Sequence, residues 1–124
     1  MPRQNVTESE YELMKILWSS KEPMTIGEIH RQLPESESKL TKNTVATLLV
    51  RLSEKGIIAY DKKGKYHYYY PILQENEYSI SETKSFLSKM FGGSVKNMMA
   101  SLYDNKELSK QDIDDLRELF NLEK

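Results

Sequence analysis

The hydrophobic period of this chain changes from 3.6 residues to two at Gly56, and this change limits the folds available to it. Before Gly56, four apolar residues recur at i, i+3, i+4 and i+7, which is the spacing of a helix that buries one face. These four residues are Val45, Leu48, Leu49 and Leu52. After Gly56, segments 57–61 and 65–71 are rich in β-branched and aromatic residues, and Lys62-Lys63-Gly64 supplies a turn, so we expect a β-hairpin.

Helix starts are marked by capping signals, in which a hydroxyl and a carboxylate satisfy free backbone N–H groups. Capping boxes at 7–10 and 25–28 predict two helices, and Thr41 is a good N-cap for a third. Further boxes at 79–82 and 109–112 predict helix starts in the second half. Three helices followed by a hairpin is the order of a winged helix-turn-helix, so the predicted fold is mainly α with a small β-hairpin wing.

The two halves of the chain differ in charge. Residues 1–71 hold 11 Lys/Arg and 9 Asp/Glu, whereas residues 72–124 hold 7 and 10. Phosphate would repel the acidic half, so we expect a winged-helix DNA-binding domain at 1–71 and a three-helix dimerisation domain at 72–124. The apolar faces of the second half are too small to enclose a core alone, and a second copy is their natural partner. The residues assigned to this interface are Phe86, Leu87, Met90, Phe91, Val95, Met98, Met99, Leu102, Ile113, Leu116 and Phe120.

Basic residues concentrate between 39 and 65, where seven Lys/Arg face two Asp/Glu. This distribution is typical of a nucleic-acid-binding surface, although a solvated helix face is the ordinary alternative. The residues assigned to base edges are Lys42, Asn43, Ala46 and Thr47. Those assigned to the DNA backbone are Thr41, Thr44, Arg51, Lys62, Lys63 and Lys65. Simple capping is as good an explanation for the two threonines, and Arg51 has an acidic neighbour as an alternative partner.

Several function classes are excluded by composition. The chain has no cysteine, which removes disulfides, thiolate metal sites and cysteine nucleophiles. His30 and His67 are isolated, so we expect no metal site and no cofactor. No catalytic grouping is recognisable, so an enzyme is not expected. No apolar run approaches membrane-spanning length and the start is unlike a signal peptide, so we expect a cytoplasmic protein without membrane insertion.

Four segments in order resemble the BlaI/MecI/CopY family of bacterial penicillinase repressors. They are Ser9–Trp18, Thr44–Leu52 with Lys55-Gly56, Lys63-Gly64-Lys65 with Tyr69 and Pro71, and Leu108–Arg117. The Gly92-Gly93 break also falls where those repressors have one. The resemblance implies a homodimer that binds a pseudo-palindromic double-stranded operator and represses genes of the β-lactamase or antibiotic-resistance type.

In several members of that family, a membrane sensor that detects a β-lactam triggers proteolysis within the C-terminal helices. The corresponding place here is Ser101-Leu102, where those members have an Asn–Phe pair. The copper-responsive branch uses cysteines that this chain lacks. Two other readings stay open: a winged-helix module for protein–protein assembly without specific DNA, and a metal-responsive repressor using His30 or His67.

Overall fold

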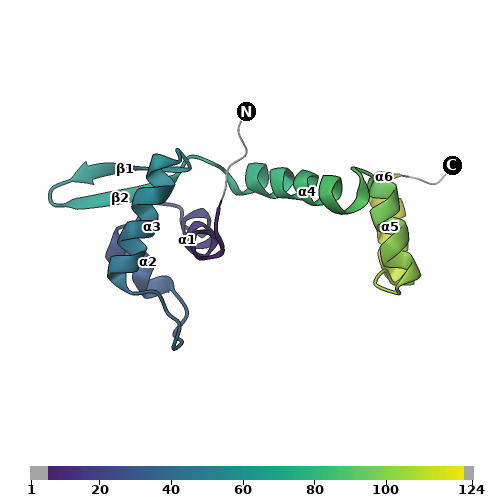
Figure 1. Cartoon of the computed structure of the whole chain (residues 1–124), viewed down its shortest axis with the longest axis horizontal. Helices are drawn as coiled ribbons and strands as arrows, with labels where there is room; N and C mark the ends of the chain where they lie inside the picture. Colours follow the sequence, from purple (N-terminus) through teal and green to yellow (C-terminus); the bar gives the residue numbers. More distant parts are fainter. Residues whose placement is uncertain (1–5, 122–124) are drawn as a thin grey trace. The chain divides into compact units, whose positions relative to one another are not determined.

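The computed structural model describes residues 6–121 and divides the chain into two compact units, Met1–Ser79 and Ile80–Lys124. The first unit begins with three helices and a two-stranded antiparallel hairpin (Figure 1). These elements are α1 (Glu8–Ser19), α2 (Ile26–Gln32), α3 (Lys42–Glu54), β1 (Ile58–Lys63) and β2 (Tyr66–Pro71). Mostly helical structure with one hairpin confirms the predicted winged-helix fold class.

The three N-terminal helices start where their capping residues predict. Thr7 and Thr25 each accept a hydrogen bond from the N–H of the third helical residue, and that residue's glutamate returns one to the cap. Thr41 caps α3 through the N–H of Thr44, at 3.1 Å. Each cap satisfies an N–H group that the helix itself leaves free, so the helix boundaries follow from local sequence.

One hydrophobic core joins these helices to the hairpin. The side chains of Leu13, Ile29 and Leu49, one from each helix, are fully buried. The remaining buried members are Met14, Leu17, Met24, Leu33, Val45, Leu48, Leu52, Ile57, Ile58 and Tyr69. The predicted apolar stripe of α3 therefore packs entirely inward, which fixes the face that α3 presents to solvent.

The hairpin is longer than the sequence suggested. Lys63 pairs with Tyr66, so the turn is Gly64-Lys65 and not Lys62-Lys63-Gly64. Gly64 has φ of +63°, as a two-residue hairpin turn requires, and this places both preceding lysines within β1. β2 is also tied to the helices, because Met24 and Tyr69 exchange backbone hydrogen bonds at 2.9 and 2.8 Å.

An ion pair between a buried carboxylate and a partly exposed lysine joins the start of α1 to the end of α3. Glu10 is buried, and its Oε1 accepts hydrogen bonds from Lys55 Nζ at 2.7 Å and from the Thr7 N–H at 3.0 Å. Burial alone would raise the pKa of the Glu10 carboxyl, but the hydrogen bonds from Lys55 and Thr7 and the Lys55 charge together lower it. No local pattern in the sequence predicts this pairing, because its two partners lie 45 positions apart.

An aromatic cluster attaches the start of α4 (Glu75–Phe91) to α1. Tyr78 lies 5.8 Å from Tyr11 and 5.7 Å from Trp18, measured between ring centroids. Trp18 Nε1–H also donates to the Leu73 carbonyl at 2.9 Å. The box at 79–82 was therefore wrong as a helix start: α4 begins at Glu75, where Glu77 accepts the Gln74 N–H instead.

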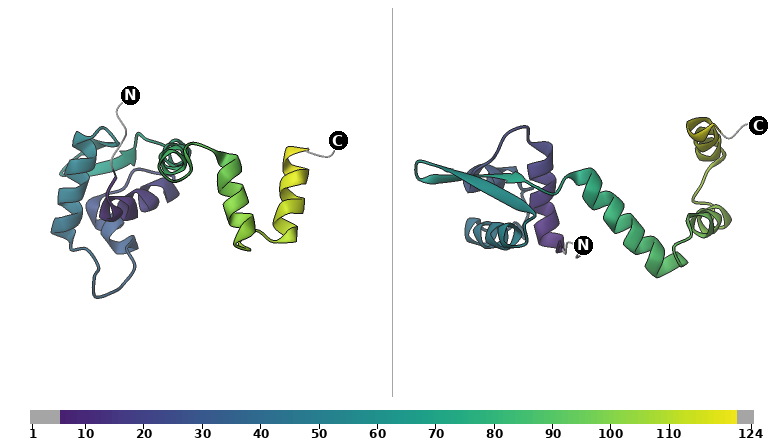
Figure 2. Two further views of the ribbon diagram at one scale, coloured as in Figure 1. Left: turned by 45° about the vertical axis from the view of Figure 1, so that its right-hand side comes forward. Right: turned by 90° about the horizontal axis from the view of Figure 1, so that it is seen from above.

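The second unit contains the rest of α4, α5 (Val95–Asp104) and α6 (Lys110–Phe120). The predicted break is present: Gly92 and Gly93 have positive φ, and Ser94 caps α5. A capping box at 109–112 starts α6, as expected. The α5 and α6 helices lie side by side (Figure 2), and a groove runs between them. Its lining residues are Met99, Leu108, Asp112, Asp115, Leu116 and Leu119.

Candidate nucleic-acid interface

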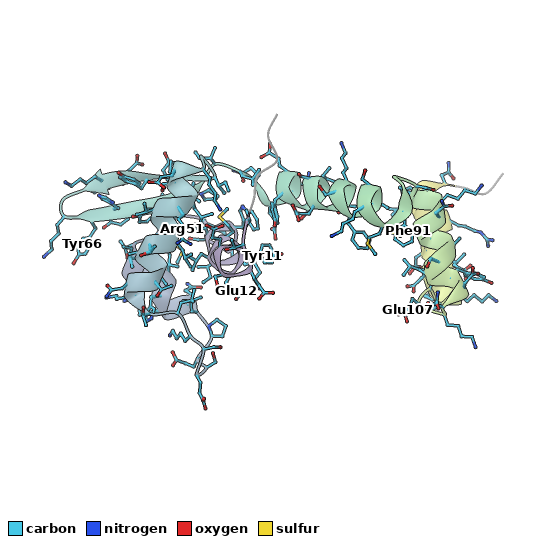
Figure 3. All side chains as sticks on the ribbon, viewed as in Figure 1. Tyr11, Glu12, Arg51, Tyr66, Phe91 and Glu107 are labelled. Carbon is cyan, nitrogen blue, oxygen red and sulfur yellow. The ribbon has the colours of Figure 1, made fainter. Side chains whose placement is uncertain are left out.

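The outward face of α3 carries most of the residues assigned to DNA. Asn43 and Thr47 are exposed one turn apart, and Ala46 between them is half-buried. Thr41, Lys42, Thr44 and Arg51 are exposed as well. Figure 3 labels Arg51 on α3 and Tyr66 near the tip of the hairpin. The structure thus brings the helical part of the predicted site onto one solvent-facing surface.

The threonine hydroxyls on this face have defined internal partners. Thr41 Oγ1 donates to Thr44 Oγ1 at 3.0 Å and accepts the Thr44 N–H, so both side chains serve the helix cap. Thr47 Oγ1 donates to the Asn43 carbonyl at 3.1 Å. Because its proton is used in this way, Thr47 offers an outside ligand its methyl group and the hydroxyl lone pairs.

Two of the hairpin lysines lie over tyrosine rings. Lys63 Nζ lies 5.6 Å from the centroid of Tyr68, and Lys65 Nζ lies 5.7 Å from that of Tyr66. Such contacts restrain a long side chain while its ammonium group stays in solvent. The tyrosines of the hairpin therefore have two uses, since Tyr69 packs in the core and Tyr66 and Tyr68 support the lysines.

Two of the seven cations between 39 and 65 are engaged elsewhere. Lys55 is held by the buried Glu10, and Lys39 pairs with Glu35, which lowers the pKa of the Glu35 carboxyl. Among the residues that the structure describes, the other five form no ion pair. These five are Lys42, Arg51, Lys62, Lys63 and Lys65. Between residues 39 and 65, the cations without an ion-pair partner are therefore fewer than the sequence count indicated, and they lie on α3 and the hairpin.

A groove connects α2, α3 and β2, and it contains residues that sequence reasoning missed. Its lining residues are Thr25, Ile26, Gly27, Glu28, Arg31, Lys42, Asn43, Ala46, Lys65, Tyr66, His67 and Tyr68. Arg31 was not among the predicted site residues because a single arginine on a short helix has no distinguishing pattern. Its position as the second cation beside Lys42 depends on how α2 and α3 pack.

Neither histidine belongs to a group of potential metal ligands among the described residues. His67 stacks on Tyr60 with ring centroids 4.2 Å apart. Within residues 6–121, no three acidic or histidine side chains gather as potential metal ligands. Over the same range, no helix combines the length and apolar character needed to cross a membrane.

The residues assigned to dimerisation lie on all three helices of the second half. Leu87 is buried, and Phe86 and Phe91 contact each other with ring centroids 6.0 Å apart. Four of the assigned side chains are at least half exposed in the single chain: Phe86, Met90, Val95 and Phe120. Ser101 and Leu102, assigned to cleavage, are half-buried within α5.

Comparison with known proteins identifies the relatives of this chain. The sequence model of the penicillinase repressor family matches residues 6–121. The chain is 28% identical over 116 residues to a penicillinase repressor of Staphylococcus aureus, covering 94% of this chain and 90% of that protein. It is 28% identical over 114 residues to the penicillinase repressor of Bacillus licheniformis, covering 92% and 88%.

A third relative is the methicillin resistance regulatory protein MecI of Mammaliicoccus sciuri. It is 29% identical over 119 residues, covering 94% of this chain and 93% of that protein. These matches confirm the resemblance seen in the sequence motifs. Because the family match extends over nearly the whole chain, the protein belongs to the penicillinase repressor family, a family of transcriptional repressors and not of enzymes.

Proposed function

We propose that this protein is a homodimeric repressor that binds a pseudo-palindromic operator in double-stranded DNA through α3. The observation that carries the proposal is the division of α3 into two faces. Its apolar face is fully packed in the core, whereas its other face exposes Asn43, Thr47 and Arg51. A helix anchored in this way can enter a major groove without unfolding any part of the domain.

The base-reading part of the proposal uses the first turns of α3. The Asn43 side chain can form two hydrogen bonds with adenine, because its amide NH₂ can donate to N7 while its amide oxygen accepts from the N6 amino group. Such a bidentate pair gives discrimination of about 1–3 kcal/mol against another base. Ala46 and Thr47 offer methyl groups suited to the methyl of thymine. The Thr47 hydroxyl adds an acceptor, since its proton is donated to the Asn43 carbonyl.

The cations flanking this face are assigned to phosphates. Arg51 lies two turns along α3, and three lysines lie on the hairpin at 62, 63 and 65. Contacts of this kind position a protein on the duplex and carry little sequence information. Thr41 and Thr44 cap the helix in the free protein, and their exposed hydroxyls lie where a phosphate could be bound near the helix start.

The dimer is proposed to form through the second unit. Phe86, Met90, Val95 and Phe120 expose apolar side chains that one chain leaves in water, and a second copy would cover them. Phe120→Asp should therefore convert the dimer to a monomer in sedimentation experiments without unfolding the first unit. Lys110→Asp, at the exposed start of the same helix, is the matched control. A Phe120→Asp protein that stays dimeric would contradict the assigned interface.

The regulated genes are inferred from the relatives, which are named for penicillinase and methicillin resistance. We infer that this repressor acts in the cytoplasm on genes of the antibiotic-resistance type, and that a membrane sensor-protease pathway releases it. The proposed cut lies at Ser101-Leu102 inside α5, where the Ser101 carbonyl accepts the Asn105 N–H at 3.2 Å. Cleavage there would require α5 to unwind and would separate α6 from the rest of the dimer unit.

Operator binding is tested by competition gel shift with the promoter region of the protein's own gene. The parent should bind that probe more tightly than random duplex by about a thousandfold or more, as is usual for specific recognition. Asn43→Ala with Thr47→Ala should remove most of this preference while the dimer persists. Equal binding of the parent to both probes would support the assembly-module reading instead.

A further inference from the structure

The groove between α2, α3 and β2 contains two cations from different helices that meet at one glycine. A Cβ atom built on Gly27 would lie 3.7 Å from Arg31 Nη1 and 3.9 Å from Lys42 Nζ. Arg31 comes from the last turn of α2 and Lys42 is the first residue of α3. Neither charge is neutralised, because no carboxylate among the described residues forms an ion pair with them.

Glu28 is the carboxylate on the same helix that also lines this groove, and one of its oxygens, Oε1, is engaged in the capping box of α2. Its Oε1 accepts the Thr25 N–H at 2.9 Å and the Thr25 hydroxyl at 3.3 Å in the capping box of α2. Lys65 and His67 line the groove from the hairpin side. Two like charges held close together raise the free energy of the empty protein, and an anion placed between them relieves that repulsion.

We propose that Gly27, Arg31 and Lys42 form a clamp for one backbone phosphate of the operator duplex. This inference rests on the proposed function and assigns it a residue outside α3 and the hairpin. Arg31 presents a planar donor pair suited to two phosphate oxygens, and Lys42 adds a point charge from the other helix. Gly27 has no side chain, so the phosphate can lie directly over α2 between the two cations.

The clamp gives Lys42 a backbone role, and it leaves base reading to Asn43, Ala46 and Thr47. The two roles have different consequences. Loss of a phosphate contact weakens binding to all sequences about equally and lowers the salt slope by about one, whereas loss of a base contact changes sequence preference. Lys42→Ala and Arg31→Ala should therefore each weaken binding to operator and to random duplex by the same factor, about fivefold to twentyfold.

Gly27→Ala separates a role in binding from a role in folding. The added methyl group would make only ordinary van der Waals contacts, and alanine in a helix is favoured over glycine by about 0.5–1 kcal/mol. The variant should therefore be as stable as the parent or more so, yet bind DNA about tenfold more weakly because the methyl occupies the space of the phosphate. Unchanged affinity in a folded Gly27→Ala protein would overturn the clamp.

Ethylation interference on the operator gives the direct test with the full-length protein. One phosphate in each half-site should block binding of the parent when it is ethylated, and the same modification should have no effect on Arg31→Ala with Lys42→Ala. Lys89→Ala, which removes one positive charge from the second unit, should keep the parent pattern. Identical interference patterns in the double variant and the parent would refute the clamp.

Measurements on random duplex keep this inference separate from operator recognition. A parent that binds all duplexes equally would contradict the proposed function, but a salt slope lowered by Arg31→Ala would still support the clamp. If the parent prefers its operator but the salt slope of Arg31→Ala equals that of Lys89→Ala, the clamp is refuted and the proposed function is not.

Discussion

Removal of the Lys55 ammonium should destabilise the first unit far more than removal of an exposed charge. Lys55→Met keeps most of the aliphatic stem, but it leaves Glu10 with the Thr7 N–H as its remaining hydrogen-bond donor to Oε1. Glu10 Oε2 is buried without a hydrogen-bond partner, so the carboxylate has little other stabilisation. The substitution therefore places an almost uncompensated charge in the interior.

The size of the effect follows from the burial of the two partners. Breaking a fully buried ion pair by removing one partner costs about 3–5 kcal/mol. The Glu10 side chain is 1% exposed but that of Lys55 is 32% exposed, so water already screens one end. We therefore expect a loss of about 2–3 kcal/mol in the free energy of unfolding, or a fall of roughly 10 °C or more in Tm for a domain of this size.

Urea unfolding followed by tryptophan fluorescence measures this loss in the correct part of the chain. Trp18 is the sole tryptophan and lies in the first unit, so its emission reports the unfolding of that unit. Lys15→Met is the matched control, because Lys15 and Glu12 form an ion pair 3.1 Å long with both side chains exposed. Exposed pairs contribute about 0–1 kcal/mol. Equal effects of Lys55→Met and Lys15→Met would refute the reasoning.

The same pair predicts a pH dependence of definite sign. The folded pKa of Glu10 is lowered, so its contribution is complete above the ordinary value of 4.5 and is lost as the pH falls through the folded pKa. The parent should therefore lose this stability on acidification below about pH 4.5, and Lys55→Met should not. If the parent and Lys55→Met differed in free energy of unfolding by the same amount at pH 7 and at pH 3, the lowered pKa of Glu10 would be contradicted.

Two further substitutions test the aromatic cluster and the hairpin turn. Trp18→Phe removes the indole donor to the Leu73 carbonyl and should cost about 1–2 kcal/mol in urea unfolding followed by circular dichroism; an unchanged midpoint would contradict this. Gly64→Val forces a β-branched residue to φ of +63°, so it should lower the stability of the hairpin by about 1–3 kcal/mol and weaken operator binding. A Gly64→Val protein with parental affinity would show that the hairpin does not contribute to binding.

The sequence was sufficient for the parts of the fold that depend on local interactions. Thr7, Thr25 and Thr41 start their helices where predicted, because a cap acts on N–H groups only two or three residues away. The α3 stripe is buried as its spacing indicates. The predicted start of α4 at Ser79 was wrong, because the preceding residue, Tyr78, packs on α1 as part of the helix. This contact is distant in sequence, so a local capping signal does not reveal it.

The residues of the positive surface are not predictable from the charge count alone, because a count does not show which charges are paired in the folded protein. Lys55 belongs to the basic segment in sequence, but its partner Glu10 is 45 residues away and removes it from the exposed positive surface. Arg31 lies outside that segment, yet the packing of α2 against α3 brings it beside Lys42. The distribution of charge along the sequence therefore indicates the approximate position of the positive surface. Tertiary contacts determine which cations belong to it.

Hydroxyl-radical footprinting on the promoter of the protein's own gene tests the central claim most directly. The dimer should protect two half-sites related by a dyad, with centres about one helical turn of 10–10.5 base pairs apart or a small multiple of it. Asn43→Ala with Thr47→Ala should lose both protected regions together. Protection of a single asymmetric region, or equal protection of every sequence, would contradict sequence-specific binding by a symmetric dimer through its two α3 helices.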